Sequence, residues 1–379
     1  MRSTRRARLW PRVLAALSIA AACGAALPGC DRTASAPGPS PEAAPRPVNP
    51  QSGLAPIEDV VRFVENLGTA SLSEESARRL TFVAIDVSTN SIVGIDADGQ
   101  PLGPLATDPA QKSDLAVTRD GSRIAFVRRI DQPIKRYDVV TMARDGRDKR
   151  ILTLAHPDVA ETERQARAGN GRKATRYENP YFAPDGRSLV LFAEMPDRRE
   201  GVFRLDAGGA KLESLAESTR AERGAAHYRF PCLSSDGLRF ACVRRIAEAN
   251  DEGLVEEIVL VTIEGRAESP VHRAAPNVVV RPLAFAPDDS SLLVVEVGGD
   301  SDSRLVLLPL GGGGAPARTL VTARNAVGSF SPDGRSVVYS AERADSEEIY
   351  VVAVEGGDPR RLTRAGGRLR GPVWLPAAR

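Results

Sequence analysis

Short apolar runs of strand length recur along the chain, and each is bounded by a polar turn. The clearest unit covers residues 330–363, which read FSPDGRSVVYSAERADSEEIYVVAVEGGDPRRLT. Within it, a charged loop separates apolar runs at Val337–Tyr339 and Ile349–Val354, and a last short run stands at Arg361–Thr363. Runs of this length between Pro, Gly and Asp are typical of β-strands. The unit therefore predicts a four-stranded antiparallel meander, which needs similar neighbours to bury its faces.

The turn that opens this unit recurs along the chain. Pro presets the backbone of such a turn, Asp bonds to its own backbone, and Gly accepts a positive φ. An apolar strand follows each turn, and a further strand follows that one after a polar loop. This recurrence predicts the blades of a β-propeller, in which the turn residues have a structural role and are not paired catalytic carboxylates. The turn residues are Asp120, Gly121, Asp185, Gly186, Asp236, Gly237, Asp288, Asp333 and Gly334.

The two ends of the repeat complement each other. Strands are predicted at Leu80–Asp86, Ser91–Asp96 and Pro101–Ala106, with no first strand before them, whereas Gly371–Pro376 copies the start of the repeat and then stops. A ring of blades must hide its open edges, and pairing of this C-terminal strand with the N-terminal blade would do so. We therefore predict an all-β fold: a six-bladed β-propeller over residues 80–379, preceded by a short helix. Five and seven blades are the alternative counts.

The N-terminus has the composition of an export signal. Five arginines within the first twelve residues precede an Ala-rich apolar run at Val13–Leu27, which is shorter than a membrane span requires. The run ends in Leu27-Pro28-Gly29-Cys30, which resembles the lipobox of bacterial lipoproteins. The resemblance implies a signal peptide over residues 1–29, lipid attachment at Cys30, and a place on the periplasmic side of the inner or outer membrane. An ordinary secretory signal peptide is the alternative.

Two segments lead from this signal to the ring. Residues 30–54 are rich in Pro and Ala, so they cannot bury enough apolar surface to fold and are predicted to form an extended tether. Residues 55–79 are predicted to be a helical segment that packs on the propeller, with a partner-binding helix as the alternative. Glu74–Leu80 offers a second helical turn within it, and a first helix is indicated by the helical spacing of Ile57, Val60, Val61, Val64 and Leu67.

Composition and motifs point away from several function classes. The 379 residues carry 51 Lys and Arg against 49 Asp and Glu, a net charge of +2, which gives no reason to expect a nucleic-acid partner. There is no Gly-x-Ser-x-Gly motif, and Gly311–Gly314 lacks the Lys of a phosphate loop. The three histidines, His156, His227 and His272, are scattered, which disfavours a histidine metal site. No catalytic residue, metal site or cofactor is predicted.

Two charged insertions interrupt the repeat, at residues 157–177 and 247–256. Both are interpreted as solvated loops. A functional role is the alternative for the first insertion, because long loops on a rigid scaffold often carry function.

Cys232 and Cys242 lie on consecutive predicted strands around the turn at Ser235–Gly237. An exported protein could join them in a disulfide. A one-residue offset from direct opposition would instead place them on opposite faces of the hairpin or diagonally. Two buried free thiols are the equal alternative.

The repeat as a whole resembles the TolB-type propeller, a relative of the WD-repeat propellers. The resemblance covers about residues 80–376 and is carried by the Pro-Asp-Gly turns and the closing stretch IYVVAVEGGDPRRLT. TolB-type periplasmic proteins also carry an N-terminal α/β domain, for which residues 51–79 are too few. The TolB role in the Tol-Pal envelope system is therefore not carried over intact.

We expect an exported, lipid-anchored monomer that is not an enzyme and acts as a protein-binding scaffold or sensor, with an envelope protein or peptide as its partner. One alternative is a propeller enzyme, or a binder of a small ligand or metal, with its site at the central channel. Another is a sensor-domain subunit without chemistry of its own. A cluster of histidines or calcium ligands at the channel mouth would favour the enzyme.

Overall fold

The computed structural model describes residues 66–131, 136–153, 174–209, 211–219, 225–247, 254–298, 302–311, 316–343, 346–363 and 367–377, all within one compact unit. The signal peptide, Cys30 and the tether lie outside these ranges, as do His156 and most of the predicted first helix and of both charged insertions. Within the ranges, one helix, α2 (Glu74–Arg79), precedes the strands. Ser73 caps it by accepting a hydrogen bond from the Ser76 amide at 3.2 Å. The second helical turn and the all-β class are confirmed.

The described strands pair into five antiparallel sheets, four of them with four strands. The first sheet joins the two ends of the described chain in the order β23 (Leu369–Trp374), β1 (Phe82–Asp86), β2 (Ser91–Ile95) and β3 (Pro101–Ala106). The second contains β4 (Gln111–Val117), β5 (Arg123–Ile130), β6 (Arg136–Ala143) and β7 (Arg150–Ile151). The third contains β8 (Arg176–Phe182), β9 (Leu189–Glu194), β10 (Arg199–Leu205) and β11 (Leu212–Thr219). The fourth contains β12 (His227–Leu233), β13 (Arg239–Ala247), β14 (Leu254–Thr262) and β15 (Glu268–Arg273).

The remaining sheet has seven strands because one long strand serves two repeat units. Strand β19 pairs with β18 over its first half and with β20 over its second. The sheet therefore runs β16 (Val279–Phe285), β17 (Ser291–Val297), β18 (Asp302–Pro309), β19 (Arg318–Phe330), β20 (Ser336–Arg343), β21 (Ser346–Ala353) and β22 (Arg360–Arg361). At the corresponding point the other units have a separate fourth strand and first strand, with a connection between them.

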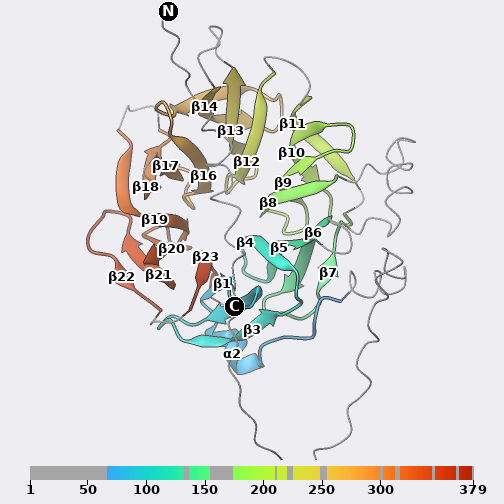
Figure 1. Ribbon diagram of the computed structural model, residues 1–379, viewed down its shortest axis with the longest axis vertical. Coiled ribbons are helices and arrows are strands. Elements are labelled where there is room, and N and C mark those ends of the chain that lie inside the picture. Colours follow the sequence, from blue (N-terminus) through green and yellow to red (C-terminus); the bar gives the residue numbers. More distant parts are fainter. Residues whose placement is uncertain are drawn as a thin grey trace, which may run out of the picture. The chain divides into compact units, whose positions relative to one another are not determined.

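We call the strand of each repeat unit that lies towards the middle of the described strands its first strand (Figure 1). These first strands are β23, β4, β8, β12, β16 and the second half of β19. Neighbouring first strands contact one another in the order β4, β8, β12, β16, β19, β23 and back to β4.

The core is a set of apolar layers, each shared by two neighbouring units. One layer packs Phe82 and Ala84 of the first unit against Val338 and Ile349 of the last. Another packs Ala125 and Val139 against residues of β9 and β10. The second strands are buried along nearly their whole length, as in Ile124–Val127, because their two faces meet two different layers. Their continuous apolar runs follow from this double burial.

Candidate functional site

The repeated aspartates lie in the turns between first and second strands, and their carboxylates bond within the same turn. Asp120 accepts hydrogen bonds from the Thr118 hydroxyl at 2.6 Å and the Ser122 amide at 3.0 Å. The Thr118 hydroxyl and the Ser122 groups lower the pKa of Asp120 to about 2. Asp185, Asp236, Asp288 and Asp333 each accept a bond from the backbone amide two residues further on. These carboxylates therefore stabilise the conformation of their own turns.

Neighbouring turns also interlock. Gly237 has a φ of +71°, and a Cβ on it would lie 2.5 Å from Cδ of Pro184 in the preceding turn. Ser235 in the same turn donates its amide and hydroxyl to Asp289 of the next turn, at 2.8 and 2.7 Å. The turn motif therefore serves contacts between units as well as the reversal of the chain.

A second repeated contact joins the third strand of five units, β6, β10, β14, β18 and β21, to the first strand of the next unit. We call its third-strand member the junction residue. In β10, β14 and β18 it lies two positions before the register shift between the third strand and the fourth strand beside it. Glu200 accepts a bond from Arg229 at 3.2 Å, and Glu347 accepts two from Arg370 at 2.7 and 2.9 Å. At the other described junctions, Glu256 accepts from the Val280 amide, Ser303 from the Ala326 amide, and the Tyr137 ring faces Arg176.

The first strands supply the positively charged residues at these junctions. Each has a register shift against its second strand, and just before it four of them carry an arginine: Arg229, Arg281, Arg324 and Arg370. Arg229 and Arg370 are paired with junction glutamates. Arg281 lies 4.1 Å over the ring of Phe230, a residue whose φ of 53° is rare for a bulky side chain. Among the described residues, Arg281 and Arg324 have no carboxylate within ion-pair distance.

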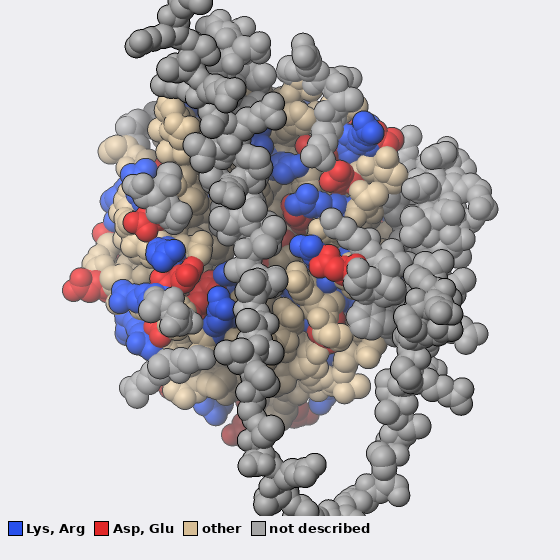
Figure 2. Space-filling view, viewed as in Figure 1, with Lys and Arg blue, Asp and Glu red and all other residues tan. Residues whose placement is uncertain are grey.

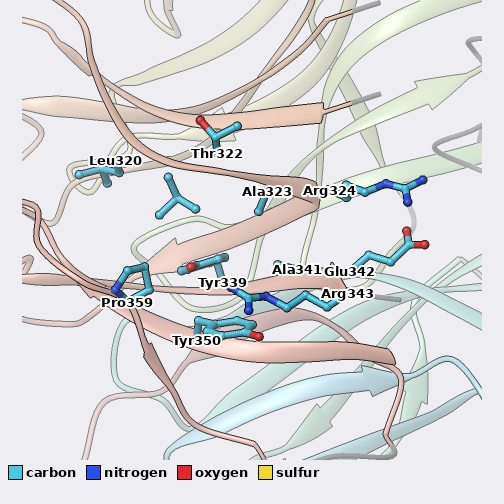
Figure 3. Close-up of a pocket in the computed structure, with 11 residues that line it drawn as sticks. Leu320, Thr322, Ala323, Arg324, Tyr339, Ala341, Glu342, Arg343, Tyr350 and Pro359 are labelled. Carbon is cyan, nitrogen blue, oxygen red and sulfur yellow. The ribbon is translucent and has the colours of Figure 1, made fainter. Parts of the chain in front are cut away.

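A cavity of about 390 Å³ lies beside Arg324, between β19 on one side and β20 and β21 on the other. Figure 3 shows Arg343 reaching across the ring of Tyr350, with Arg324 and Glu342 at one end and Pro359 at the other. The rings of Tyr339 and Tyr350 stack with centroids 5.5 Å apart and an interplanar angle of 23°. Glu342 accepts a bond from the side-chain amide of Asn325. The two guanidinium groups lie apart: Figure 3 shows that of Arg324 beside the Glu342 carboxylate and that of Arg343 over the ring of Tyr350.

The segment that follows the tether is fastened to the second sheet. Arg128, buried and paired with Asp138 at 2.8 Å, donates a hydrogen bond to the carbonyl of Asn66 at 3.1 Å. Lys149 donates to the carbonyl of Ala70 at 2.6 Å, and Leu72 enters the apolar layer between the first and second sheets. The start of the described chain is therefore held at a fixed place on the second sheet.

Cys232 and Cys242, which lie on neighbouring strands, are both buried free thiols. Cys232 stands opposite Ala241 in the register, so Cys242 points to the other face of the hairpin. The two thiols accordingly belong to different apolar layers. Burial raises the pKa of both far above the usual range of a thiol. The structure therefore corresponds to the free-thiol alternative.

Two described histidines and two acids at the end of the second insertion, Glu256 and the adjoining Glu257, take part in pairs between strands. His227 lies 3.1 Å from Glu200, and His272 lies 3.0 Å from Glu296. The interpretation of residues 247–256 as a solvated loop is wrong for its last members. Glu256 is largely buried in β14 beside Arg245, and Glu257, which follows it, bonds to Arg244. These arginines on β13 compensate the burial of the carboxylates.

Figure 2 shows acidic and basic side chains side by side over the described part of the visible face. Within the ranges described above, no three His, Cys, Asp or Glu side chains converge as metal ligands would. The described part of the chain also contains no helix long and apolar enough to span a membrane.

Neither the junction residues nor the cavity was identified from the sequence. One signal was available: Arg229 and Arg281 both stand seven residues before a turn aspartate, at Asp236 and Asp288. The junction residues are harder to find, because Tyr, Glu and Ser share the position and no single motif marks it.

No known family model matches the sequence. The fold is similar to that of TolB from Acinetobacter baumannii, with a TM-score of 0.57 and 17% identity over 78% of this chain and 66% of that chain, so this chain spans just under two thirds of its length. It is similar to a putative TolB from Agrobacterium tumefaciens, with a TM-score of 0.50 and 12% identity over 79% of this chain and 99% of that one. A chain in a nidogen/laminin complex matches with a TM-score of 0.53 and 11% identity over 78% and 98% of the two chains. The fold is a TolB-type β-propeller.

Proposed function

We propose that the protein is an exported, lipid-anchored, six-bladed β-propeller that binds a partner protein or peptide on the periplasmic side of a bacterial membrane, as a scaffold or sensor. The observation that carries this proposal is the combination of a TolB-type propeller fold with an N-terminal sequence that ends in Leu27-Pro28-Gly29-Cys30. Two or three acyl chains on Cys30 would give a stable membrane anchor.

Several contacts support six blades closed into a ring. Strand β23 from the C-terminal end pairs with β1, with Trp374 opposite Phe82 and the two ring centroids 4.7 Å apart. The first strands contact each other in one cycle, and the long strand β19 would supply the outer strand of the fifth blade and the inner strand of the sixth. Closure in this way gives β1 a paired strand on each side.

The contacts of residues 66–72 with the second sheet support the proposal of a tethered propeller. Because Asn66, Ala70 and Leu72 are held on the second sheet, the tether would leave the ring at one defined place. A Pro- and Ala-rich tether of residues 30–54 would then set how far the ring reaches from the membrane.

The proposal is tested in cells by placing a photo-crosslinking amino acid at Leu238, which is 65% exposed in a turn, in the native chain and in a Cys30→Ala variant. We expect the native protein in the membrane fraction with one or two crosslinked envelope proteins. In Cys30→Ala we expect release from the membrane and loss of those crosslinks. Retention of Cys30→Ala in the membrane would contradict the lipid anchor, and a folded native ring without crosslinks at this and other exposed turn positions would contradict the scaffold.

A second function, binding of a small ligand, is favoured by one observation, the cavity beside Arg324. A ligand site at the central channel, as in propeller enzymes, would instead draw on the first strands, where Arg281 has no carboxylate partner among the described residues.

A further inference from the structure

The two ends of the described chain meet at one side chain of the second sheet. Arg144 lies in the turn between β6 and β7 and donates a hydrogen bond to the carbonyl of Leu80, the residue two before β1. It also donates to the carbonyl of Pro376, two residues after β23, at 2.7 Å. Because β1 and β23 pair with each other, one guanidinium group holds both flanks of the strand pair that joins the two ends.

Arg144 also serves the C-terminal end of α2. The last carbonyl groups of a helix have no partner within it, and Arg144 donates to the carbonyl of Ala77 at 3.4 Å as well as to that of Leu80, the C-cap residue. A positive group at this end also interacts favourably with the helix dipole. A helix of six residues is not stable on its own, so α2 depends on contacts of this kind.

Residues 66–80, which we call the strap, are held on the second sheet before the chain enters β1. The first described residue, Asn66, accepts a hydrogen bond through its carbonyl from Arg128 of β5 at 3.1 Å. The carbonyl of Ala70 accepts one from Lys149, in the same turn as Arg144, at 2.6 Å. The donors are cations of the second sheet and the acceptors are backbone groups of the strap, so the hold does not depend on which side chains the strap carries.

The strap also packs on the first sheet. Leu72 and Leu80 are buried, and a Cβ on Gly94 of β2 would lie 3.2 and 2.8 Å from their Cδ1 atoms. Both leucines belong to the apolar layer between the first and second sheets, and Figure 1 shows α2 beside the first sheet. The strap therefore spans the boundary between the two sheets.

The order of these contacts decides where a pull on the tether would act. A force that enters from residues 30–54 meets Asn66 and Ala70, which are bonded to the second sheet, before it reaches β1. Without the strap contacts, the force would act directly on the end of the β1–β23 pair, where Phe82 stands opposite Trp374. The strands would then separate one residue pair at a time from that end.

We propose that the strap carries a pull on the tether into the second sheet and so shields the β1–β23 pair from it, with Arg144 as the residue that holds the strap and the pair together. The role of the strap rests on the proposed membrane tether only for the source of the pull. Burial of Leu72 and Leu80 alone would cover the apolar layer, whereas the bonds from Arg128, Lys149 and Arg144 fix the strap at successive points along its length.

The test pulls the unlipidated mature chain in an optical trap, with one handle on Cys30 and the other on Leu238→Cys, an exposed turn position of the fourth sheet. The other two thiols, Cys232 and Cys242, are buried and do not take up a handle in the folded chain. At constant force we expect Lys149→Ala to shorten the lifetime of the folded chain about tenfold, because loss of one hydrogen bond from a charged donor is enough for such a change.

A second geometry separates this role from a general effect on stability. With Cys30→Ser and the first handle at the C-terminal end, the pull acts on β23 and bypasses the strap, so Lys149→Ala should change the lifetime less than about twofold. Arg144→Ala should shorten the lifetime in both geometries, because Arg144 also holds the chain after β23. Arg147→Ala, at an exposed arginine of the same turn, is the matched control and should change the lifetime less than about twofold in both.

Three results would each overturn the proposal: a native lifetime of Lys149→Ala under the pull from Cys30, equal shortening by Lys149→Ala in both geometries, or a native lifetime of Arg144→Ala in both. Lys149→Ala decides the matter where Arg144→Ala does not fold. The trap uses neither the lipid nor a partner protein, so its result is independent of the crosslinking experiment with Cys30→Ala in cells.

Discussion

Two junctions between neighbouring repeat units solve one packing problem in different ways. At the Glu347 junction, a nearly fully buried carboxylate takes two hydrogen bonds from Arg370 and links β21 to β23. At the Ser303 junction, a buried hydroxyl links β18 to the backbone of β19, and Arg324 is left without a carboxylate partner in the described chain. The first junction joins its strands through a charged side-chain pair, and the second joins them through the backbone of β19.

The comparison shows that one position of the repeat can join neighbouring units in two ways. Glu200 and Glu347 accept hydrogen bonds from an arginine side chain of the next first strand, whereas Glu256 and Ser303 accept a bond from a backbone amide of that strand. An acid at the junction position does not by itself neutralise the arginine of the next strand, because Arg281 has no carboxylate within ion-pair distance among the described residues although Glu256 lies at its junction.

The largest effect is expected from Glu347→Ala. The change leaves Arg370 without its partner and removes the link between β21 and β23, so we expect the free energy of unfolding to fall by about 3 kcal/mol. Urea denaturation followed by circular dichroism measures this loss. Glu355→Ala, at an exposed position of the same blade, is the control and should change stability by less than about 0.5 kcal/mol. Equal effects of the two changes would contradict the role of the junction.

A somewhat smaller loss is expected from Gly237→Ala, because the new Cβ would press on Pro184 and the backbone has a φ of +71°. We expect a cost of about 2 kcal/mol, part from the backbone and part from overpacking. Gly265→Ala separates the two parts, since its φ is +76° and a Cβ there would meet nothing within 4 Å. It should cost about 1 kcal/mol. Equal unfolding midpoints for the two variants would show that the turns do not interlock as described.

The Ser303 junction should be weaker than the Glu347 junction. Ser303→Ala removes the acceptor of the Ala326 amide and the donor to the Ala323 carbonyl, with an expected cost of about 1–2 kcal/mol. A loss of stability as large as that of Glu347→Ala, measured in the same denaturant series, would remove the distinction between the two junctions.

The smallest effect concerns pH. The pKa of Asp120 is lowered to about 2 in the folded chain, below the value of about 3.9 expected for an unfolded aspartate. A depressed pKa stabilises the fold above the unfolded value, and the contribution is lost as pH falls from about 4 towards 2. Asp120→Asn should therefore be slightly less stable than the native chain at pH 7, and the difference should shrink below pH 4. A constant difference from pH 7 to pH 2.5 would contradict this assignment.

The strands and turns were predictable because their signals are local. The runs at Ile124–Val127 and Ile349–Val354 and the turn at Asp333-Gly334 specify strand length and reversal within a few residues, and each lies in or beside a strand of the structure. The link between Glu347 and Arg370 could not be found in this way, because it joins separate blades. The cavity also depends on the unbroken strand Arg318–Phe330, whereas the sequence indicated two separate units there.

The most direct test of the junctions is a double-mutant cycle on Glu347→Ala and Arg370→Ala, with unfolding free energies measured for both single variants and the double variant. A direct, structurally important pair predicts a coupling energy of about 2 kcal/mol, so that the double variant is hardly less stable than Glu347→Ala alone. Additive effects, with a coupling below about 0.5 kcal/mol, would contradict the claim that these contacts hold neighbouring blades together.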